Sequence, residues 1–354
     1  MRMIVFLLSV FLFCSCLGDS QKQDFASLRS IPIRGEHFEE EMISTTACRI
    51  NVVDSSFVVC DSNHPEALIS ILDEKTGKLQ DGWGVRGNGP GEFQLPIFLG
   101  SSKGNDTIYI ANFPAKVYAY VKNEQGKYKL VKESRIFLDK KWKGQFPMDL
   151  HRMENGYYVM TTLSGGKDFF ILLDKDCREV KRFGAHPVKG MTADICDFMP
   201  LDGRMTSYGN SFYYATFKFG YIARYDISTG GEVELKWEKY LSEPKASVSE
   251  ANIQMRSSEN LTGFYGLAAN EDYLFATYSG IYFRAFIDQN DPSANTPRTL
   301  VVFHSDGDII GKYQLPYKSM SICLSEDNRY LYVCNSQPDV AIERFKVEDI
   351  LNAE

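Results

Sequence analysis

The sequence predicts an all-β fold, namely a six-bladed β-propeller of four-stranded antiparallel blades. First, six short strand-like runs recur every 50 to 60 residues or so, and each ends in Asp, Asn or Thr. Second, turns rich in Gly, Asn and Asp separate the strands of each repeat. Third, aromatic residues make up 13% of the chain, with 20 Tyr and 24 Phe, which suits a large β core. A β unit of this length cannot bury its own apolar face, so the repeats must stack into a closed array.

The N-terminus is the first element in chain order, and it has the features of an export signal. Arg2 supplies a positive charge, and the apolar run from Ile4 to Phe13 is too short to span a bilayer. The next residues, Phe-Cys-Ser-Cys, resemble a bacterial lipobox in which Cys16 becomes the lipidated N-terminus. We therefore expect a lipoprotein signal peptide over residues 1–16, a tether over 17–31 and a single propeller domain over 32–354. An ordinary signal peptide cleaved nearby is the alternative.

The six strand-like runs mark the six blades. They are FVVCD ending at Asp61, IYIAN at Asn112, YYVMT at Thr161, FYYAT at Thr216, YLFAT at Thr277 and LYVCN at Asn335. In each repeat one strand precedes this run, a third strand follows it, and a fourth closes most blades. The last repeat ends after its third strand, near residues 343–347. We expect an N-terminal strand, about Pro32 to Glu40, to complete that sheet and close the ring, because closure removes exposed sheet edges.

The connection after the first blade is rich in glycine. Residues 82–96 read GWGVRGNGPGEFQLP, where the glycines allow backbone angles that other residues avoid. This stretch resembles the blade-to-blade connection of NHL-type and TolB-like six-bladed propellers, in particular those found as lipoproteins in Bacteroides-type bacteria. The resemblance implies the fold and says little about function, because propellers include lyases, lactonases, receptors and scaffolds. A phosphate-binding loop is the alternative, although the Lys-Ser/Thr pair of a P-loop is missing.

Two later connections are longer than the others. Residues 241–261 are polar and Ser-rich, and we expect a loop with a short helical turn. Residues 288–298 carry two prolines and indicate an exposed excursion. Long loops on a propeller often line its binding face.

Charge and cysteine content limit the partners. The formal net charge is −7, and no basic stretch is interleaved with aromatics, so we expect no nucleic-acid partner. Cys48 with Cys60, and Cys323 with Cys334, each flank a predicted hairpin turn, where a disulfide is conceivable in an exported protein. The favoured interpretation is that these are small core residues, since Cys60 and Cys334 stand where other repeats have Ala.

The sequence carries no catalytic or metal-binding signature. The five histidines lack metal-ligand spacing, and no GxSxG motif is present, so we expect no cofactor. Asp61, Asn112 and Asn335 end three of the repeated strands at equivalent places around the axis. They are candidate calcium ligands if the protein is a calcium-dependent lactonase or lyase. The favoured interpretation is that such residues cap their own turns, because a repeated residue usually has a repeated structural role.

Ligand-binding residues are better sought where the blades differ. The candidates are Arg86, Asn88, Arg152, Arg204 and Tyr208. An arginine facing the channel of a propeller can bind a carboxylate, although a solvated arginine is the plain alternative. The three tryptophans, at 83, 142 and 237, could stack on sugar rings or pack between blades.

The preferred function is therefore a non-catalytic binding or scaffold lipoprotein of the cell envelope, either periplasmic or displayed at the surface. We expect a monomer that recognises a protein, peptide or glycan ligand on one face of the ring and touches the membrane only through its lipid anchor. The alternatives are the calcium-dependent lactonase or lyase and a glycan-binding protein.

Overall fold

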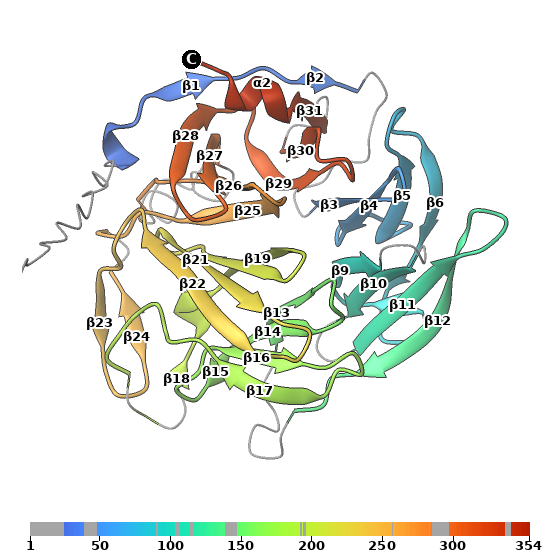
Figure 1. Cartoon of the computed structure of the whole chain (residues 1–354). Coiled ribbons are helices and arrows are strands. Elements are labelled where there is room, and N and C mark those ends of the chain that lie inside the picture. Colours follow the sequence, from blue (N-terminus) through green and yellow to red (C-terminus); the bar gives the residue numbers. More distant parts are fainter. Residues whose placement is uncertain are drawn as a thin grey trace, which may run out of the picture.

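A computed structural model of the chain has the predicted architecture, a ring of six small antiparallel sheets (Figure 1). It describes residues 25–38, 48–89, 91–102, 107–112, 116–138, 147–191, 193, 196–256, 258–282, 284, 297–336 and 341–354. The signal peptide and Cys16 lie outside these residues, as do Trp142 and most of the excursion at 288–298. None of the helices in the described ranges is long and apolar enough to cross a membrane.

The blades follow one another around the ring in chain order. The first three are β3 (Cys48–Val53), β4 (Ser56–Asp61), β5 (Ile69–Asp73) and β6 (Leu79–Trp83); β9 (Pro96–Ser102), β10 (Thr107–Asn112), β11 (Lys116–Lys122) and β12 (Tyr128–Arg135); and β13 (Pro147–Arg152), β14 (Tyr158–Thr162), β16 (Phe170–Leu173) and β17 (Glu179–Phe183). The next two are β19 (Gly203–Tyr208), β20 (Ser211–Thr216), β21 (Tyr221–Ile227) and β22 (Val233–Tyr240); and β25 (Phe264–Ala269), β26 (Tyr273–Tyr278), β27 (Thr299–His304) and β28 (Ile309–Gln314). The sixth is β29 (Ser319–Leu324), β30 (Tyr330–Asn335) and β31 (Ile342–Lys346), completed by β2 (Glu36–His37).

Short elements lie between and beside the blades. They are the 3-10 helices η1 (Phe25–Ser27) and η3 (Met199–Leu201), the C-terminal helix α2 (Val347–Leu351), and the two-stranded pairs β7 (Val85–Arg86) with β8 (Glu92–Phe93), β15 (Ser164–Gly165) with β18 (Cys196–Asp197), and β23 (Ala246–Val248) with β24 (Ile253–Met255). The last pair is a hairpin, where the sequence predicted a loop with a helical turn. The β-branched and apolar residues Val248 and Ile253 face each other in it, and local strand pairing therefore prevails over the polar composition.

The repeated runs are the second strands of the blades, as predicted. All six residues of β4 are buried, and β14 is buried throughout. A second strand lies in the middle of its blade and packs against a neighbouring blade on each face, so both of its faces are apolar. Large aromatic side chains fill the spaces between blades, for example Phe169, Phe170, Phe212 and Tyr214 between blades three and four.

An N-terminal strap, residues 25–38, closes the ring and crosses two blades (Figure 1). Strand β2 pairs antiparallel with β31 through His37 and Glu343, which confirms the predicted closure. Strand β1 (Ser30–Pro32) pairs in parallel with β28 and gives blade five a fifth strand. The ring of Phe25 packs edge-on against Tyr278 with centroids 5.3 Å apart. The strap therefore includes part of the segment that the sequence assigned to a tether.

The outer strands share a device that the sequence did not reveal. In blades one to five the outer strand carries one extra residue at an equivalent place, a β-bulge at Gln80, Val131, Val180, Lys236 and Ile310. A bulge bends and twists an edge strand, which discourages pairing with another chain. In blades one to four the bulge thus protects an outer edge that ring closure alone leaves exposed, whereas the outer edge of β28 is paired with β1.

The described cysteines Cys60, Cys177, Cys323 and Cys334 are buried free thiols. Burial raises the pKa of the Cys60 thiol to about 12. Cys48 pairs across the strands with Asp61, whereas Cys60 pairs with Arg49. The register therefore does not place Cys48 and Cys60 directly opposite each other in the hairpin.

Candidate functional site in the central channel

The first strands of the blades surround a channel along the ring axis. Two cavities follow each other in it, a wide mouth of about 640 Å³ and an inner cavity of about 80 Å³. The residues that line both are Asn51, Phe98, His151, Thr206, Leu267 and Ile322. The mouth opens on the face that carries the turns between first and second strands, including those at Asp54 and Asn328. We call this the hairpin face.

Four charged side chains gather at the inner cavity, and we call them the channel charge cluster: Arg49, Asp149, Asp202 and Arg204. Arg49 lies on β3, Asp149 on β13, and Arg204 on β19, two residues after Asp202. Arg49 Nη1 is 3.7 Å from Asp149 Oδ1, too long for a strong hydrogen bond. The carboxylates instead accept backbone N–H groups, Asp149 Oδ1 from Leu150 at 3.0 Å and Asp202 Oδ1 from Gly203 at 2.8 Å.

Burial governs the titration of this cluster. It raises the pKa of the Asp202 carboxyl to about 6, and the charge of Asp149 acts in the same direction while Arg204 opposes it. Burial and the neighbouring charge of Arg49 lower the pKa of Arg204 to about 10. Each shift means that the charged form lies in a poorly solvated place. At neutral pH Asp202 is therefore mostly deprotonated, while Arg204 keeps its positive charge.

Arg204 is held in position by uncharged contacts. Its Nε donates to the backbone carbonyl of Tyr265 at 3.2 Å. Its Cζ lies 4.6 Å from the centroid of the Phe217 ring, and Phe217 stacks on Tyr265 with ring centroids 5.1 Å apart. A guanidinium against an aromatic face is stabilised by the ring quadrupole. The side chain is therefore held through its Nε and the face of its guanidinium, and it lines the inner cavity.

His151 lies where the inner cavity meets the mouth. Its Nε2 is 2.9 Å from Ser207 Oγ, a bond that joins the first strands of blades three and four. Burial lowers the pKa of His151 to about 4, with Arg152 acting in the same direction and Asp149 against it. The imidazole is therefore neutral at physiological pH, which suits hydrogen bonding rather than charge pairing.

The structure separates the five predicted ligand-binding residues. Arg204 and Tyr208 both line the channel from β19, at the inner cavity and the mouth respectively. Arg152 also lines the mouth, but its Cζ lies 4.1 Å from the Tyr109 ring centroid and its Nη1 donates to the Ser101 carbonyl at 3.2 Å. Arg86 and Asn88 lie in the first blade-to-blade connection, where Arg86 Nη2 donates to the Ser62 carbonyl and Asn88 accepts from Gln94 at 2.8 Å.

The glycine-rich connection folds around its own carboxylate. Gly89 N–H donates to Glu92 Oε2 at 2.7 Å, and a Cβ on Gly87 would lie 1.9 Å from that oxygen. Glu92 therefore occupies the position in which an anion would sit in a phosphate-binding loop. The connection is built as a structural turn between β7 and β8.

The six residues that end the repeated strands bond mostly within their own blades. Asp61 Oδ1 accepts from Asn63 N–H at 2.9 Å. Asn112 accepts from Gln94 N–H at 2.9 Å and donates to the Glu92 carbonyl at 3.1 Å, while Asn335 donates to Glu343 Oε2 at 3.1 Å. Among the residues that the structure describes, no group of three or more His, Cys, Asp or Glu side chains could hold a metal ion.

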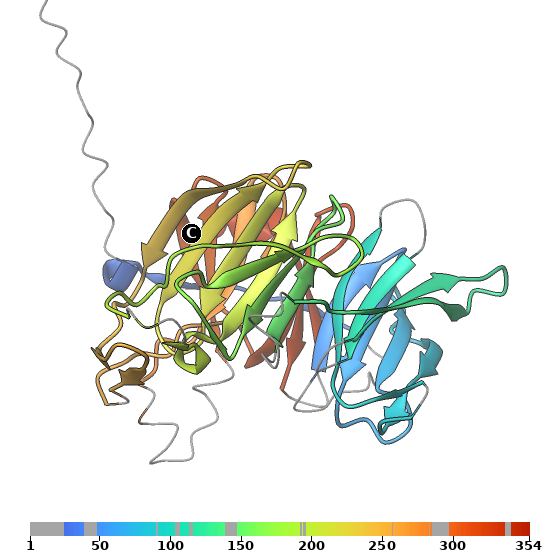
Figure 2. The same cartoon turned by 90° about the horizontal axis from the view of Figure 1, so that it is seen from below.

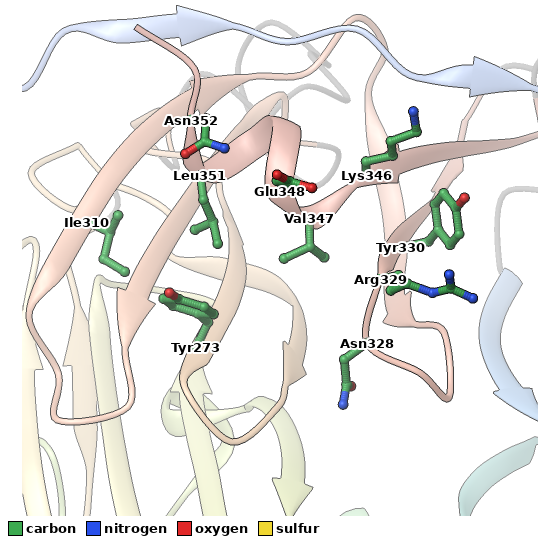
Figure 3. A pocket seen from close by; sticks show the side chains of 10 residues that line it. All are labelled: Tyr273, Ile310, Asn328, Arg329, Tyr330, Lys346, Val347, Glu348, Leu351 and Asn352. Carbon is green, nitrogen blue, oxygen red and sulfur yellow. The ribbon is translucent and has the colours of Figure 1, made fainter.

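The remaining cavities and tryptophans lie away from the channel. A cavity of about 580 Å³ between blades five and six is lined by turn residues and by α2, and Tyr273, Val347 and Leu351 face it (Figure 3). Trp83 packs against Tyr120 and Tyr128, and Trp237 against Tyr213 and Phe303. Trp83 and Trp237 thus pack against aromatic neighbours, the first between blades one and two and the second between blades four and five.

Sequence reasoning missed most of the channel charge cluster. Arg49 and Arg204 each pair with the fourth residue of a repeated run, Cys60 and Ala215. Both arginines therefore stand 11 residues before that position. Blades one and four oppose each other across a six-bladed ring (Figure 1). Two arginines at the same spacing in opposing repeats were the sequence signal from which the cluster could have been predicted.

Known proteins show likeness to this chain only in structure. No family model and no curated protein matches it. A member of the DUF4221 family from Bacteroides vulgatus is 12% identical with a TM-score of 0.55, covering 90% of this chain and 97% of that one. A Bacteroides fragilis protein named as exported is 12% identical with a TM-score of 0.50, covering 86% and 83%. The β-propeller domain of Swd1 from Myceliophteria thermophila is also 12% identical, with a TM-score of 0.51 and coverage of 86% and 98%. The likeness shows the fold.

Proposed function

We propose that the protein is a non-catalytic binding module outside the cytoplasm that takes its ligand through the channel mouth on the hairpin face. The observation that carries this proposal is the combination of a 640 Å³ mouth with the channel charge cluster at the inner cavity. Packing of the blades does not require charge in the channel, and pockets that place a few polar groups in an otherwise apolar wall are typical binding sites. Function is thus sought where the repeats differ.

The proposed location rests on sequence and on similar structures. The N-terminal residues have the pattern of a lipoprotein signal, and a similar propeller from Bacteroides fragilis is named as exported. We propose that Cys16 carries a lipid that anchors the domain to a membrane. Metabolic labelling of the full chain with a palmitate analogue tests this, and a Cys16→Ala chain that is still labelled would contradict it.

Binding is tested by thermal shift of the purified full chain in detergent. The panel contains small organic acids, oligosaccharides and peptides, and the chain is compared with a Thr206→Arg variant. Thr206 lines both cavities, so an arginine there narrows the passage between them. The matched control is Thr229→Arg on an exposed turn. We expect the panel to contain ligands that raise the melting temperature of the wild type and of Thr229→Arg but leave that of Thr206→Arg unchanged.

The same assay separates the alternatives. A ligand shift that Thr206→Arg leaves intact would contradict binding in the channel. If the chain holds a stoichiometric calcium ion, melts at a lower temperature in chelator and hydrolyses members of a lactone panel, the calcium-dependent enzyme is supported and the binding module is contradicted. Shifts confined to oligosaccharides would establish the glycan-binding alternative.

A further inference from the structure

We propose that the inner cavity is a carboxylate site in which Arg49 and Arg204 hold the acid group of a small organic acid. The inference rests on the proposed function and assigns the chemistry of its ligand. The acid group binds at the channel charge cluster, and the rest of the molecule extends toward the mouth.

The first argument is the number of unused hydrogen-bond donors. A guanidinium has five N–H donors. Within the part of the chain that the structure describes, the Arg49 side chain makes no hydrogen bond, and the Arg204 side chain uses only its Nε. No hydrogen bond joins either arginine to Asp149 or Asp202, whose bonded oxygens accept backbone N–H groups. Both guanidinium groups therefore have N–H donors left for an acceptor that enters the cavity.

The second argument is geometry. The two arginines come from opposing blades at equivalent places, so their side chains enter the channel from opposite sides. They are close enough for the charge of Arg49 to lower the pKa of Arg204. Because Tyr265 and Phe217 fix the Nε side of Arg204, its two terminal nitrogens are left for a ligand. Two adjacent N–H groups match the two oxygens of a carboxylate.

The third argument is size. The inner cavity of about 80 Å³ has room for an acid group and little more. It shares six lining residues with the 640 Å³ mouth, so a ligand bound at the arginines can continue into the wider space. The wall there offers Asn51, Thr206 and the His151–Ser207 pair as polar partners. These dimensions favour a small acid over a protein segment.

The aspartates lie beside the two arginines, and Asp202 links ligand binding to pH. The charged and titratable groups facing the inner cavity are Arg49 from β3, Asp149 and His151 from β13, Arg204 from β19 and Tyr265 from β25, with Asp202 at its edge. Strands β9 and β29 contribute only Phe98, Met320, Ser321 and Ile322. A bound carboxylate adds a negative charge near Asp202 and favours protonation of that side chain. Affinity should therefore rise as the pH falls through about 6.

The test uses trifluoroacetate as a carboxylate probe, followed by fluorine NMR on the full chain in detergent, with trifluoroethanol as the uncharged control. Wild type should show saturable binding of trifluoroacetate that is several-fold tighter at pH 5.5 than at pH 7.5. Arg49→Gln and Arg204→Gln should each weaken it by about tenfold or more, as expected for loss of a charge-assisted pair. Arg256→Gln is the matched control, because the Arg256 side chain is 55% exposed and lines neither cavity of the channel.

Further variants keep the outcome decisive. Arg204→Lys preserves the charge but not the paired donors, so it should fold and bind more weakly than wild type. Asp202→Asn should bind with nearly the same affinity at both pH values. Absence of saturable binding, or equal binding by wild type and both Gln variants with intact near-ultraviolet circular dichroism, overturns the carboxylate site. A ligand whose binding is weakened by Thr206→Arg but not by Arg49→Gln or Arg204→Gln would also overturn the carboxylate site, while still supporting the proposed binding function. Binding only of peptides with a free C-terminal carboxylate would overturn the assignment to a small acid.

Discussion

The opposed pKa shifts of Asp202 and His151 predict opposite effects on the pH dependence of stability. The pKa of Asp202 rises from 3.8 to about 6 on folding, and that of His151 falls from 6.5 to about 4. A displacement of two pKa units corresponds to about 3 kcal/mol. Both side chains keep some exposure to the channel, so we expect about 2 kcal/mol from each.

The sign differs between the two groups. Between about pH 4 and 6 the folded chain keeps a proton on Asp202 that the unfolded chain releases. This contribution to the free energy of unfolding therefore decreases as the pH rises. For His151 the unfolded chain binds the extra proton between about pH 4 and 6.5, so the contribution increases as the pH rises. The Asp202→Asn variant should consequently have a free energy of unfolding about 2 kcal/mol above that of wild type at pH 7, and nearly the same value at pH 4. The His151→Gln variant should be more stable than wild type at pH 4 but not at pH 7.

Urea denaturation at pH 4, 5, 6 and 7, followed by tryptophan fluorescence, measures both effects. The m-value must stay constant for the midpoints to report stability. Asp327→Asn is a contrasting control, because a hydrogen bond from Ser325 lowers the pKa of that exposed carboxyl and its loss should not stabilise the fold. A gain of Asp202→Asn that is equal at pH 4 and pH 7, or larger at pH 4, would refute the desolvation argument.

Three further perturbations test the fold that positions the channel. Gly87→Ala should destabilise by about 1–3 kcal/mol in urea denaturation, because the new Cβ would lie 1.9 Å from Glu92 Oε2; Gly230→Ala, whose Cβ has 3.7 Å of clearance, should be close to neutral. Ile33→Ala in the N-terminal strap should lower the free energy of unfolding by about 2–4 kcal/mol, since this residue is 8% exposed, and an unchanged midpoint would show that the strap does not hold the ring. The buried thiols, Cys60 among them, should resist alkylation in the native chain and react in urea, as mass spectrometry of the digests would show.

The fold could be predicted from the sequence because each blade of the propeller repeats the same pattern of apolar strand residues and turn residues. Each second strand is apolar on both faces, so the runs ending at Asp61 and Asn335 could be aligned without any structure. Closure could be predicted because the last repeat lacks a strand. The outer bulges could not, since Gln80, Lys236 and Ile310 share no residue type; a bulge depends on how the pleat twists at that point.

The channel was harder to predict than the blades, because the exact position of each turn decides which side chains of the first strand face the channel. Arg204 was selected because it stands on a first strand, and the structure places it at the inner cavity. Arg49 lies at the same spacing from its repeated run, but in the sequence it resembled an ordinary polar residue at the start of a strand. Arg86 was selected from a distinctive motif, yet the structure uses that motif as a turn filled by Glu92. A distinctive local pattern therefore indicated structure, while the channel cluster came from residues that are unremarkable one at a time.

This contrast gives a physical criterion for the functional face. Side chains that recur around the ring, such as Asn112, bond to the turns beside them. Arg49 and Arg204 recur in only two opposing blades, and their terminal nitrogens lack hydrogen-bond partners among the described residues. The sixfold repeat therefore does not explain why two opposing blades each carry an arginine whose terminal nitrogens are unbonded among the described residues. A ligand in the inner cavity would use these nitrogens, and this is why we place the acid group there.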